Sequence, residues 1–262
     1  WDTLARPFFL LAPMADVTDA AFRHVIAKYS KPYGPAAMFT EFVSADGLFL
    51  RPKKAGSIPH KISDKNYSQI LKNSRIVAAD HGVAPDNPLL YDLIFSEAER
   101  PIVAQFFTAI PDHMERAAAL ARELGFDGVD INMGCPDRSI EKQEAGAALI
   151  KNPQLAQELV AAAKRGAGGL PVSIKTRLGY GRDVLDEWLP ALLTTEPAAI
   201  IIHARTRKEM SKVPAHWERI ARAVEIRDAA KSKTLIAGNG DVLTLSDART
   251  KAAETGADGI MI

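Results

Sequence analysis

Eight short apolar runs alternate with helical patterns along the chain, and this alternation limits the possible folds more than any other feature. The runs are residues 8–11, 37–39, 102–106, 129–131, 172–174, 200–202, 234–237 and 259–262. Amphipathic patterns with recognisable helix starts lie at 19–29 after Thr18, at 113–124 after Pro111 and Asp112, at 154–165 after Asn152 and Pro153, and at 245–255 after Thr244. Because such alternation favours parallel strands, the sequence predicts an α/β protein, a (β/α)8 TIM barrel.

The chain departs from a regular barrel at two places. The interval from Glu41 to Gln105 is longer than the other intervals between strand ends, and its excess falls in residues 51–95, which are rich in Lys, Pro, Asn and Asp. We therefore expect an insertion after the second strand. The chain begins without a methionine and stops at Ile262, inside the eighth predicted strand. We expect a single catalytic domain over residues 1–262, taken from a longer protein.

Composition excludes several classes of protein. Hydrophobic residues make up 47% of the 262 residues and charged residues 25%, as in an ordinary soluble domain. A single cysteine cannot form an intrachain disulfide, and no Cys/His cluster indicates a bound metal. No apolar run is long enough to cross a membrane, and the N-terminus lacks the layout of a signal peptide. We expect a cytoplasmic, monomeric protein without metal or membrane attachment.

Positive charge is concentrated in one segment. The net charge is only +1, so the chain as a whole gives no sign of a nucleic-acid partner. Residues 51–75, however, contain seven basic residues and one acid. Such a segment is either a solvated loop or a contact to a phosphate backbone, and we hypothesise that it contacts RNA.

The only cysteine, Cys135, lies in a short motif, Asn-Met-Gly-Cys-Pro, directly after a predicted strand. Gly134 permits a sharp turn, and Pro136 fixes its own φ and contributes no N–H group. Such a turn presents the thiol at the mouth of a barrel, where a cysteine can act as a nucleophile, a ligand or a proton donor.

Polar residues end six of the eight predicted strands. They are Glu41, Gln105, Asn132 to Cys135, Lys175 with Arg177, His203 with Arg205, and Asn239 to Asp241, beside Pro13, Met14 and Ala15 at the first strand. Because the carboxyl ends of parallel barrel strands meet on one face, these side chains are candidates for one site.

Three of these strand ends suggest specific chemistry. A lysine at the position of Lys175 needs an anionic or electron-rich partner, since burying an unpaired ammonium is costly. A carbonyl substrate held as a Schiff base is one such partner, and a flavin, to which His203 could also donate, is another. The glycine-rich turn at Asn239, Gly240 and Asp241 can cradle a phosphate.

Assembled in order, these residues resemble the tRNA-dihydrouridine synthase family of FMN-dependent barrel enzymes. The resemblance rests on residues 12–19 with Phe22 and Arg23, 40–45, 130–136, 146–149, 174–177, 203–206, 239–241 and 256–259, and so covers almost the whole chain. It implies that NADPH reduces FMN, that hydride passes to carbon 6 of a tRNA uracil, and that Cys135 protonates carbon 5. A thiol of ordinary pKa, about 8.5, is protonated at neutral pH and can fill this role.

The resemblance also implies the residues that hold the flavin and the substrate. Backbone contacts to the flavin come from Pro13, Met14 and Ala15, isoalloxazine contacts from Gln105, Lys175 and His203, and phosphate contacts from Asn239, Gly240 and Asp241. The uridine must leave the RNA stack to reach the flavin. We expect Asn132, Arg177 and Arg205 to hold the extruded nucleotide, and Arg182, Arg207, Lys208 and Lys212 to contact the RNA at the rim.

The resemblance further implies two parts that we expect to lie beyond Ile262 and outside this chain, a Gly-Arg pair that completes the phosphate site and a C-terminal helical domain that grips tRNA. We therefore expect the 262 residues alone to bind FMN and tRNA poorly. Other readings of the same residues are a dihydroorotate dehydrogenase-like or ene-reductase-like flavin barrel, an aldolase that uses Lys175, and a non-catalytic RNA-binding remnant.

Overall fold

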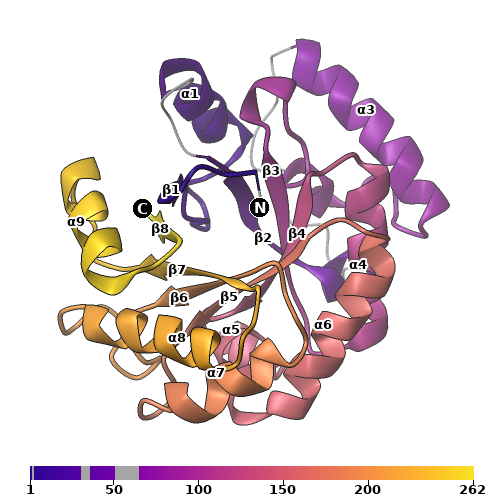
Figure 1. The fold of residues 1–262 in the computed structure, drawn as a ribbon. Helices are drawn as coiled ribbons and strands as arrows, with labels where there is room; N and C mark the ends of the chain where they lie inside the picture. Colours follow the sequence, from indigo (N-terminus) through magenta and orange to yellow (C-terminus); the bar gives the residue numbers. More distant parts are fainter. Residues whose placement is uncertain (2, 31–35, 51–64) are drawn as a thin grey trace.

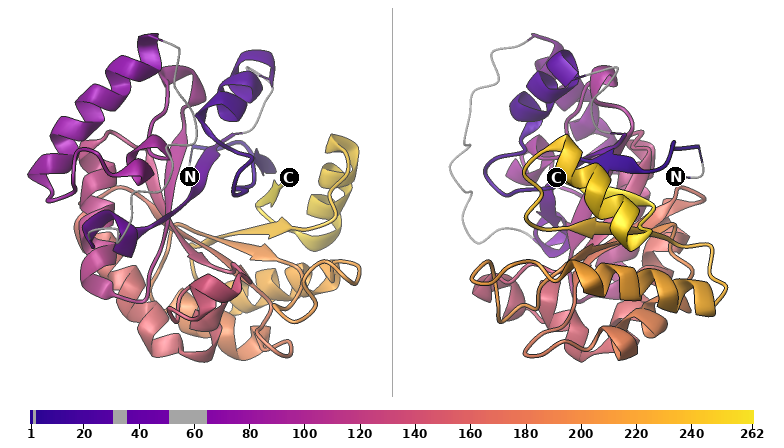
Figure 2. Two further views of the ribbon diagram at one scale, coloured as in Figure 1. Left: turned by 180° about the vertical axis from the view of Figure 1, so that it is seen from behind. Right: turned by 60° about the vertical axis from the view of Figure 1, so that its left-hand side comes forward.

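The computed structural model describes residues 1, 3–30, 36–50 and 65–262. Their strands form one parallel sheet with helices on its outside (Figure 1; Figure 2 shows two other sides), which confirms the predicted (β/α)8 class. The strands are β1 (Phe8–Leu10), β2 (Met38–Ser44), β3 (Ile102–Phe107), β4 (Gly128–Met133), β5 (Val172–Arg177), β6 (Ala199–His203), β7 (Leu235–Asn239) and β8 (Gly259–Met261).

The first and last strands are neighbours. The sheet order is β1-β8-β7-β6-β5-β4-β3-β2, with every pairing parallel. A parallel bridge between Leu10 and Ala37 then links β1 to the start of β2. Two backbone hydrogen bonds support it, from Leu11 N to Ala37 O at 3.2 Å and from Ala36 N to Phe9 O at 2.7 Å. The sheet therefore returns to its first strand.

Four predicted helices are confirmed, namely α1 (Ala20–Ser30), α4 (Pro111–Glu123), α6 (Pro153–Ala167) and α9 (Leu245–Thr255). Two further helices, α7 (Leu185–Leu193) and α8 (Trp217–Ala229), lie where no helical pattern was predicted. The caps of α6 and α9 are as expected, since Asn152 accepts a hydrogen bond from Leu155 N and Thr244 accepts one from Asp247 N. At α1 the expected start, Thr18, is wrong, because Asp19 accepts from Phe22 N while Thr18 hydrogen-bonds to Met14.

The predicted insertion is described only in part. Residues 51–64, which carry most of the basic segment, lie outside the described residues. Residues 65–95 contribute α3 (Lys65–Asp80) and the 3₁₀ turn η1 (Pro88–Tyr91), and α3 lies beside α4 on the outside of the barrel (Figure 1). The described portion is thus a packed element, and its reading as an insertion stays a prediction.

Strand alternation divides the side chains into two sets. Outward positions such as Val129, Ile131 and Ile174 join the large core between strands and helices. Inward positions near the strand starts form a second cluster that includes Phe39 and Ile201. Further along the same inward rows the apolar residues give way to polar ones, and this polar layer forms the floor of the site described next.

The remaining helices are short. They are α2 (Ala45–Phe49), α5 (Arg138–Glu141) and the 3₁₀ turns η2 (Glu97–Glu99) and η3 (Gly146–Lys151). In the portion that the structure describes, no helix is both long and apolar enough to cross a membrane.

Candidate active site

A cavity of about 470 Å³ opens at the carboxyl ends of the strands. Most of the predicted site residues line it, namely Pro13, Met14, Asn132, Cys135, Lys175, Arg177, His203, Asn239, Gly240 and Asp241. Ala15, Gln105 and Arg205 do not line it. The strands therefore bring together a thiol, a lysine and an imidazole, as a parallel barrel is expected to do.

Lys175 is an inward residue of β5 that the barrel encloses, and its side chain lines the cavity. Its Nζ donates to Asn239 Oδ1 at 3.1 Å, and Asn239 Nδ2 donates to Met261 O at 3.0 Å. Burial, and then the nearby Arg177, lower the pKa of Lys175 to about 8. The hydrogen-bond partner of the lysine is a neutral amide, so its charge remains available to a ligand in the cavity.

A directed chain of hydrogen bonds runs beneath the cavity. Gln105 Nε2 donates to Asp130 Oδ2 at 2.7 Å, and Gln105 Oε1 accepts from Asn132 Nδ2 at 3.1 Å. Asn132 Oδ1 in turn accepts from the backbone N–H groups of Gly134 at 3.1 Å and Cys135 at 2.9 Å. Gln105, predicted as a flavin contact, thus lies in the floor and supports Asn132 and the cysteine loop.

Asp130, a residue for which the sequence predicted no role, begins this chain of hydrogen bonds. It is buried between β3 and β5, and Ser173 Oγ donates to its second oxygen at 2.5 Å. Burial raises its pKa to about 6, and the donated hydrogen bonds oppose this shift. The sequence did contain one sign of a role for Asp130. It stands two residues before Asn132 and therefore lies on the same inward face of β4.

Cys135 lies on a tightly held loop. Its carbonyl accepts from Ala147 N at 2.9 Å, and an added Cβ on Gly146, whose φ is 61°, would lie 2.9 Å from that carbonyl. Burial is the largest influence on the thiol and raises its pKa. The cysteine therefore keeps its proton at neutral pH, which suits a proton donor better than a preformed thiolate nucleophile.

Arg177 joins the cysteine loop to the loop after β6. Its Nε donates to Gly134 O at 2.8 Å, and its Nη1 lies 3.3 Å from Thr206 O and 3.4 Å from Met210 O. Burial lowers its pKa to about 10, so the side chain is still a cation at neutral pH. Because it also lines the cavity, Arg177 places positive charge beside Cys135.

His203 and Arg205 form a pair at the end of β6. Burial, followed by Lys175 and Arg177, lowers the pKa of His203 far below its ordinary value, so the ring is neutral. Arg205 Nη1 lies 3.1 Å from His203 Nε2. Because arginine can only donate, Nε2 is the acceptor and Nδ1 carries the ring proton.

Arg205 is bound on several sides by protein. Its Nη2 donates to both Asp241 oxygens at 2.6 Å, and its Nε donates to Val213 O at 2.6 Å. The side chain is buried, and the Arg205 hydrogen bond lowers the pKa of Asp241. Arg205 therefore positions His203 and Asp241, while its predicted contact to substrate stays a prediction.

Residues outside the predicted set also shape the cavity. Phe42, Thr176 and Ser211 line it, and Phe42 meets Phe107 edge to face at 5.8 Å. Glu41, an expected strand-end residue, accepts a short hydrogen bond from Asp16 N and so braces the loop that carries Met14. Among the described residues, no three His, Cys, Asp or Glu side chains gather as metal ligands would.

The fold is a closed parallel α/β barrel. Its strand ends bring a protonated thiol, an enclosed lysine and a neutral imidazole into one cavity, and this combination defines a barrel enzyme. The family model described as "Dihydrouridine synthase (Dus)" matches residues 10–262. The "Probable tRNA-dihydrouridine synthase 2" of Bacillus subtilis (strain 168) is 39% identical over 263 residues, covering 100% of this chain and 70% of the relative. The "Probable tRNA-dihydrouridine synthase" of Staphylococcus aureus (strain COL) is 37% identical, covering 100% and 69%. The chain belongs to the dihydrouridine synthase family.

Solved structures share the fold at low sequence identity. The old yellow enzyme homologue from Zymomonas mobilis gives a TM-score of 0.54 at 14% identity, over 98% of this chain and 84% of that chain. Morphinone reductase gives 0.57 at 11% identity, over 99% and 82%. These similarities support the barrel architecture, and they carry no information on substrate or cofactor.

Proposed function

We propose that this chain is the catalytic barrel of a tRNA-dihydrouridine synthase, which uses FMN and NADPH to reduce a uracil double bond in tRNA. The observation that carries the proposal is the meeting of protonated Cys135, enclosed Lys175 and neutral His203 in one cavity. The names of the B. subtilis and S. aureus relatives supply the substrate class. A tRNA substrate also makes the cytoplasm the expected location.

The residues present fit a flavin mononucleotide. Lys175, whose charge has only an amide partner, would hold the electron-rich ring, and His203 would donate to the ring through Nδ1. The turn at Asn239 and Gly240 would hold the phosphate. The ion pair with Arg205 neutralises the neighbouring carboxylate of Asp241, which would otherwise repel that phosphate. When bound, FMN supplies the hydride that reduces carbon 6 of the uracil, and NADPH replenishes it.

Cys135 supplies the second half of the reduction. Saturating the uracil double bond requires a hydride on one carbon and a proton on the adjacent one. The Cys135 thiol holds its proton at neutral pH, and Arg177 beside it stabilises the thiolate that remains after the proton has gone to carbon 5. The thiol then regains a proton from solvent before the next turnover.

Two cavity residues would hold the extruded base. Asn132 Nδ2 uses one hydrogen for Gln105, which leaves its second hydrogen for a uracil oxygen. Arg177 uses Nε and Nη1 within the protein, which leaves Nη2 for the nucleotide. At the rim, Arg207 is held by an ion pair with Glu141, so it is a weaker candidate for RNA than the sequence suggests.

The proposal is tested by measuring dihydrouridine in unmodified tRNA after incubation with the protein, FMN and NADPH, using nucleoside mass spectrometry. The wild type is expected to form dihydrouridine, and Cys135→Ala to lose about 100-fold or more of the rate, as for loss of a general acid. Cys135→Ala should still bind flavin and oxidise NADPH. A yellow, NADPH-oxidising wild type that makes no dihydrouridine would leave the flavin barrel and remove uridine as its substrate.

A further inference from the structure

Arg207 lies on the loop that follows β6, and its side chain is directed to the loop that carries the thiol. Its Nη2 donates to Pro136 O at 3.3 Å, and its guanidinium forms a bidentate ion pair with Glu141. The three other cations expected at the rim line a separate cavity between the loops after β5 and β6, namely Arg182, Lys208 and Lys212. Arg207 thus differs from them, because it is held by protein groups next to the active-site cysteine.

Two arginines hold the backbone on either side of Cys135. Gly134 O, directly before the cysteine, accepts from Arg177 Nε at 2.8 Å. Pro136 O, directly after it, accepts from Arg207. The cysteine loop is therefore fixed from β5 on one side and from the loop after β6 on the other.

The partner of Arg207, Glu141, is the last residue of the short helix α5, which follows the cysteine loop. The Glu141 side chain is 10% exposed and that of Arg207 is 23% exposed, so the ion pair is largely shielded from solvent. A bidentate arginine–carboxylate pair fixes orientation as well as distance. Arg207 therefore also joins the far end of the cysteine loop to the loop after β6.

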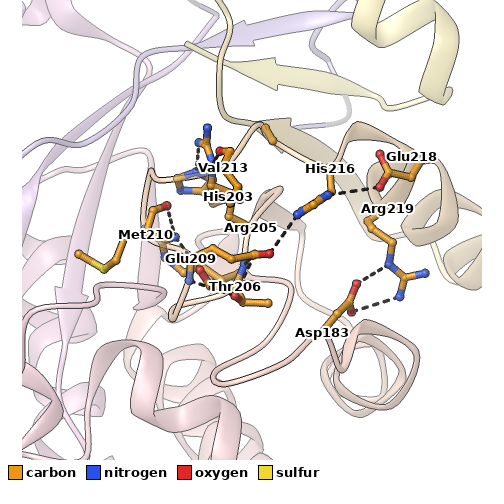
Figure 3. A network of polar contacts seen from close by, with 12 residues as sticks. Asp183, His203, Arg205, Thr206, Glu209, Met210, Val213, His216, Glu218 and Arg219 are labelled. Carbon is orange, nitrogen blue, oxygen red and sulfur yellow. Dashed lines mark hydrogen bonds and ion pairs between the residues drawn. The ribbon is translucent and has the colours of Figure 1, made fainter.

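The loop after β6 is a well-held base for Arg207. Thr206 N and Oγ1 donate to Glu209 Oε2 at 2.7 and 2.9 Å, and Glu209 Oε1 lies 3.1 Å from His216 Nε2 (Figure 3). Arg207 N then donates to Gly179 O, in the loop after β5, at 2.8 Å. Because the backbone is bound here, the Arg207 side chain projects from a fixed point.

We propose that Arg207 is a positioning residue for Cys135 and holds the thiol where it can protonate uracil carbon 5, an inference that rests on the proposed function. Proton transfer requires the donor within hydrogen-bond reach of the reacting atom, and a misplacement of about 1 Å can cost about 100-fold in rate. The uracil is presented at the strand ends, so the loop that carries the thiol has to be held to the same strands. Arg207 supplies one of these links, and its partners are protein groups and not RNA.

The charges around the thiol make this role measurable. Burial raises the pKa of the thiol most, and the carboxylates of Asp137 and Glu141 raise it further. Arg177 and Lys175, both on β5, act in the opposite sense. Loss of Arg207 leaves Glu141 as an unpaired anion, whereas loss of the Glu141 charge leaves an unpaired cation. The two losses should therefore shift the thiol pKa in opposite directions.

The first test follows alkylation of Cys135 by iodoacetamide against pH, without flavin or tRNA. Because the chain has one cysteine, the reaction reports a single thiol. The midpoint is expected to rise by about 0.5 pH unit in Arg207→Gln and to fall by about as much in Glu141→Gln. The control, Arg219→Gln, breaks an ion pair with Asp183 at a side chain that is 25% exposed, and should keep the wild-type midpoint (Figure 3). An unchanged midpoint in either of the first two variants overturns the inference.

The second test measures single-turnover dihydrouridine formation with reduced flavin over a range of tRNA concentrations. Arg207→Gln is expected to lose about tenfold of the maximal rate at an unchanged affinity for tRNA, and Arg207→Lys to recover part of that rate. Weaker tRNA binding with a normal maximal rate overturns the inference and assigns Arg207 to RNA. An equal loss in Arg219→Gln also overturns it. Failure of the proposed function would look different, because the wild type would then form no dihydrouridine while the alkylation midpoints still report the surroundings of the thiol.

Discussion

At the scale of single residues, the buried polar layer decides how the thiol is presented. An ionised Asp130 can only accept, so Gln105 must turn its Nε2 toward it and its Oε1 toward Asn132. Because Gln105 Oε1 accepts from Asn132 Nδ2, Asn132 Oδ1 faces the Cys135 loop. The orientation of two amides is thus set by one carboxylate that does not line the cavity.

Gln105→Leu should break this chain without touching the thiol. It leaves Asp130 Oδ2 and Asn132 Nδ2 without their partner, and we expect about a 10- to 100-fold loss of single-turnover dihydrouridine formation together with about 2 kcal/mol of stability. Gln157→Leu is the matched control, since it removes hydrogen bonds to Ala191 O and Thr194 on the outer face. The iodoacetamide alkylation rate of Cys135 should change only in the first variant. If the two variants behave alike, Asp130 and Gln105 are merely structural.

The neutral His203 predicts a pH dependence of stability. Its folded pKa lies well below the unfolded value of about 6.5, so below that pH the unfolded chain binds the additional proton and stability falls as pH falls. Between pH 7 and pH 5 this amounts to about 2 kcal/mol. His203→Asn should therefore lose less stability than wild type over this interval in urea denaturation. Asp130, whose pKa is raised, makes stability rise as pH falls, but it is present in both proteins. The difference between the two curves of stability against pH therefore reports His203 alone. Parallel curves would refute this role of His203.

At the scale of elements, the close approach of α4 and α6 is the most demanding contact. An added Cβ on Gly166 would lie 1.9 Å from Glu115 O, a backbone atom of α4 that cannot move independently. Helices that approach this closely require a residue without a side chain at the crossing. Gly166 therefore sets the distance between the two helices that cover β4.

Gly166→Ala is expected to lower the free energy of unfolding by about 3 kcal/mol, because the helices must separate. Gly181→Ala is the control, since no atom lies within 4 Å of its added Cβ and its φ is not in the left-handed region. Chemical denaturation of both variants measures the effect. Equal stabilities would mean that α4 and α6 adjust their packing freely.

The strands could be predicted from the sequence because each is a short apolar run and most end in a polar residue. Lys175 and Asn132 are paired neighbours on β5 and β4, so their side chains point to the same side and reach one cavity. The start of α1 could not be predicted, because Thr18 and Asp19 are both good capping residues and only the packing of Thr18 on Met14 decides between them. The ion pair of Arg205 could not be predicted either, because the sequence shows only an arginine after a predicted strand. Its partner Asp241 lies on the next strand end, and that pairing depends on tertiary structure.

At the scale of the whole molecule, Asp258 links the two ends of the barrel. Its Oδ1 pairs with Arg6 at 2.9 Å, while its Oδ2 accepts from Arg227 at 2.7 Å and from Ile236 N at 2.9 Å. The carboxylate is buried and so joins the segment before β1 to α8 and β7. It stabilises the closure of β1 against β8.

Asp258→Asn should lower the free energy of unfolding by about 2 kcal/mol or more, because two arginines lose a buried anionic partner. Asp228→Asn removes the other carboxylate on Arg227, which is largely exposed, and should cost less than about 0.5 kcal/mol. Urea denaturation compares them. Similar midpoints would show that β1 and β8 are held by their backbone pairing alone.

The neighbouring positions of β1 and β8 also bear on how the protein is made. Synthesis proceeds from the N-terminus, so β1 leaves the ribosome while its partner strand is still untranslated. The wall of the active-site cavity includes Pro13 and Met14 from one end and Met261 and Ile262 from the other. A nascent chain that has not yet reached β8 therefore has no complete cavity, and its ligand can be captured only after the last strand has been translated.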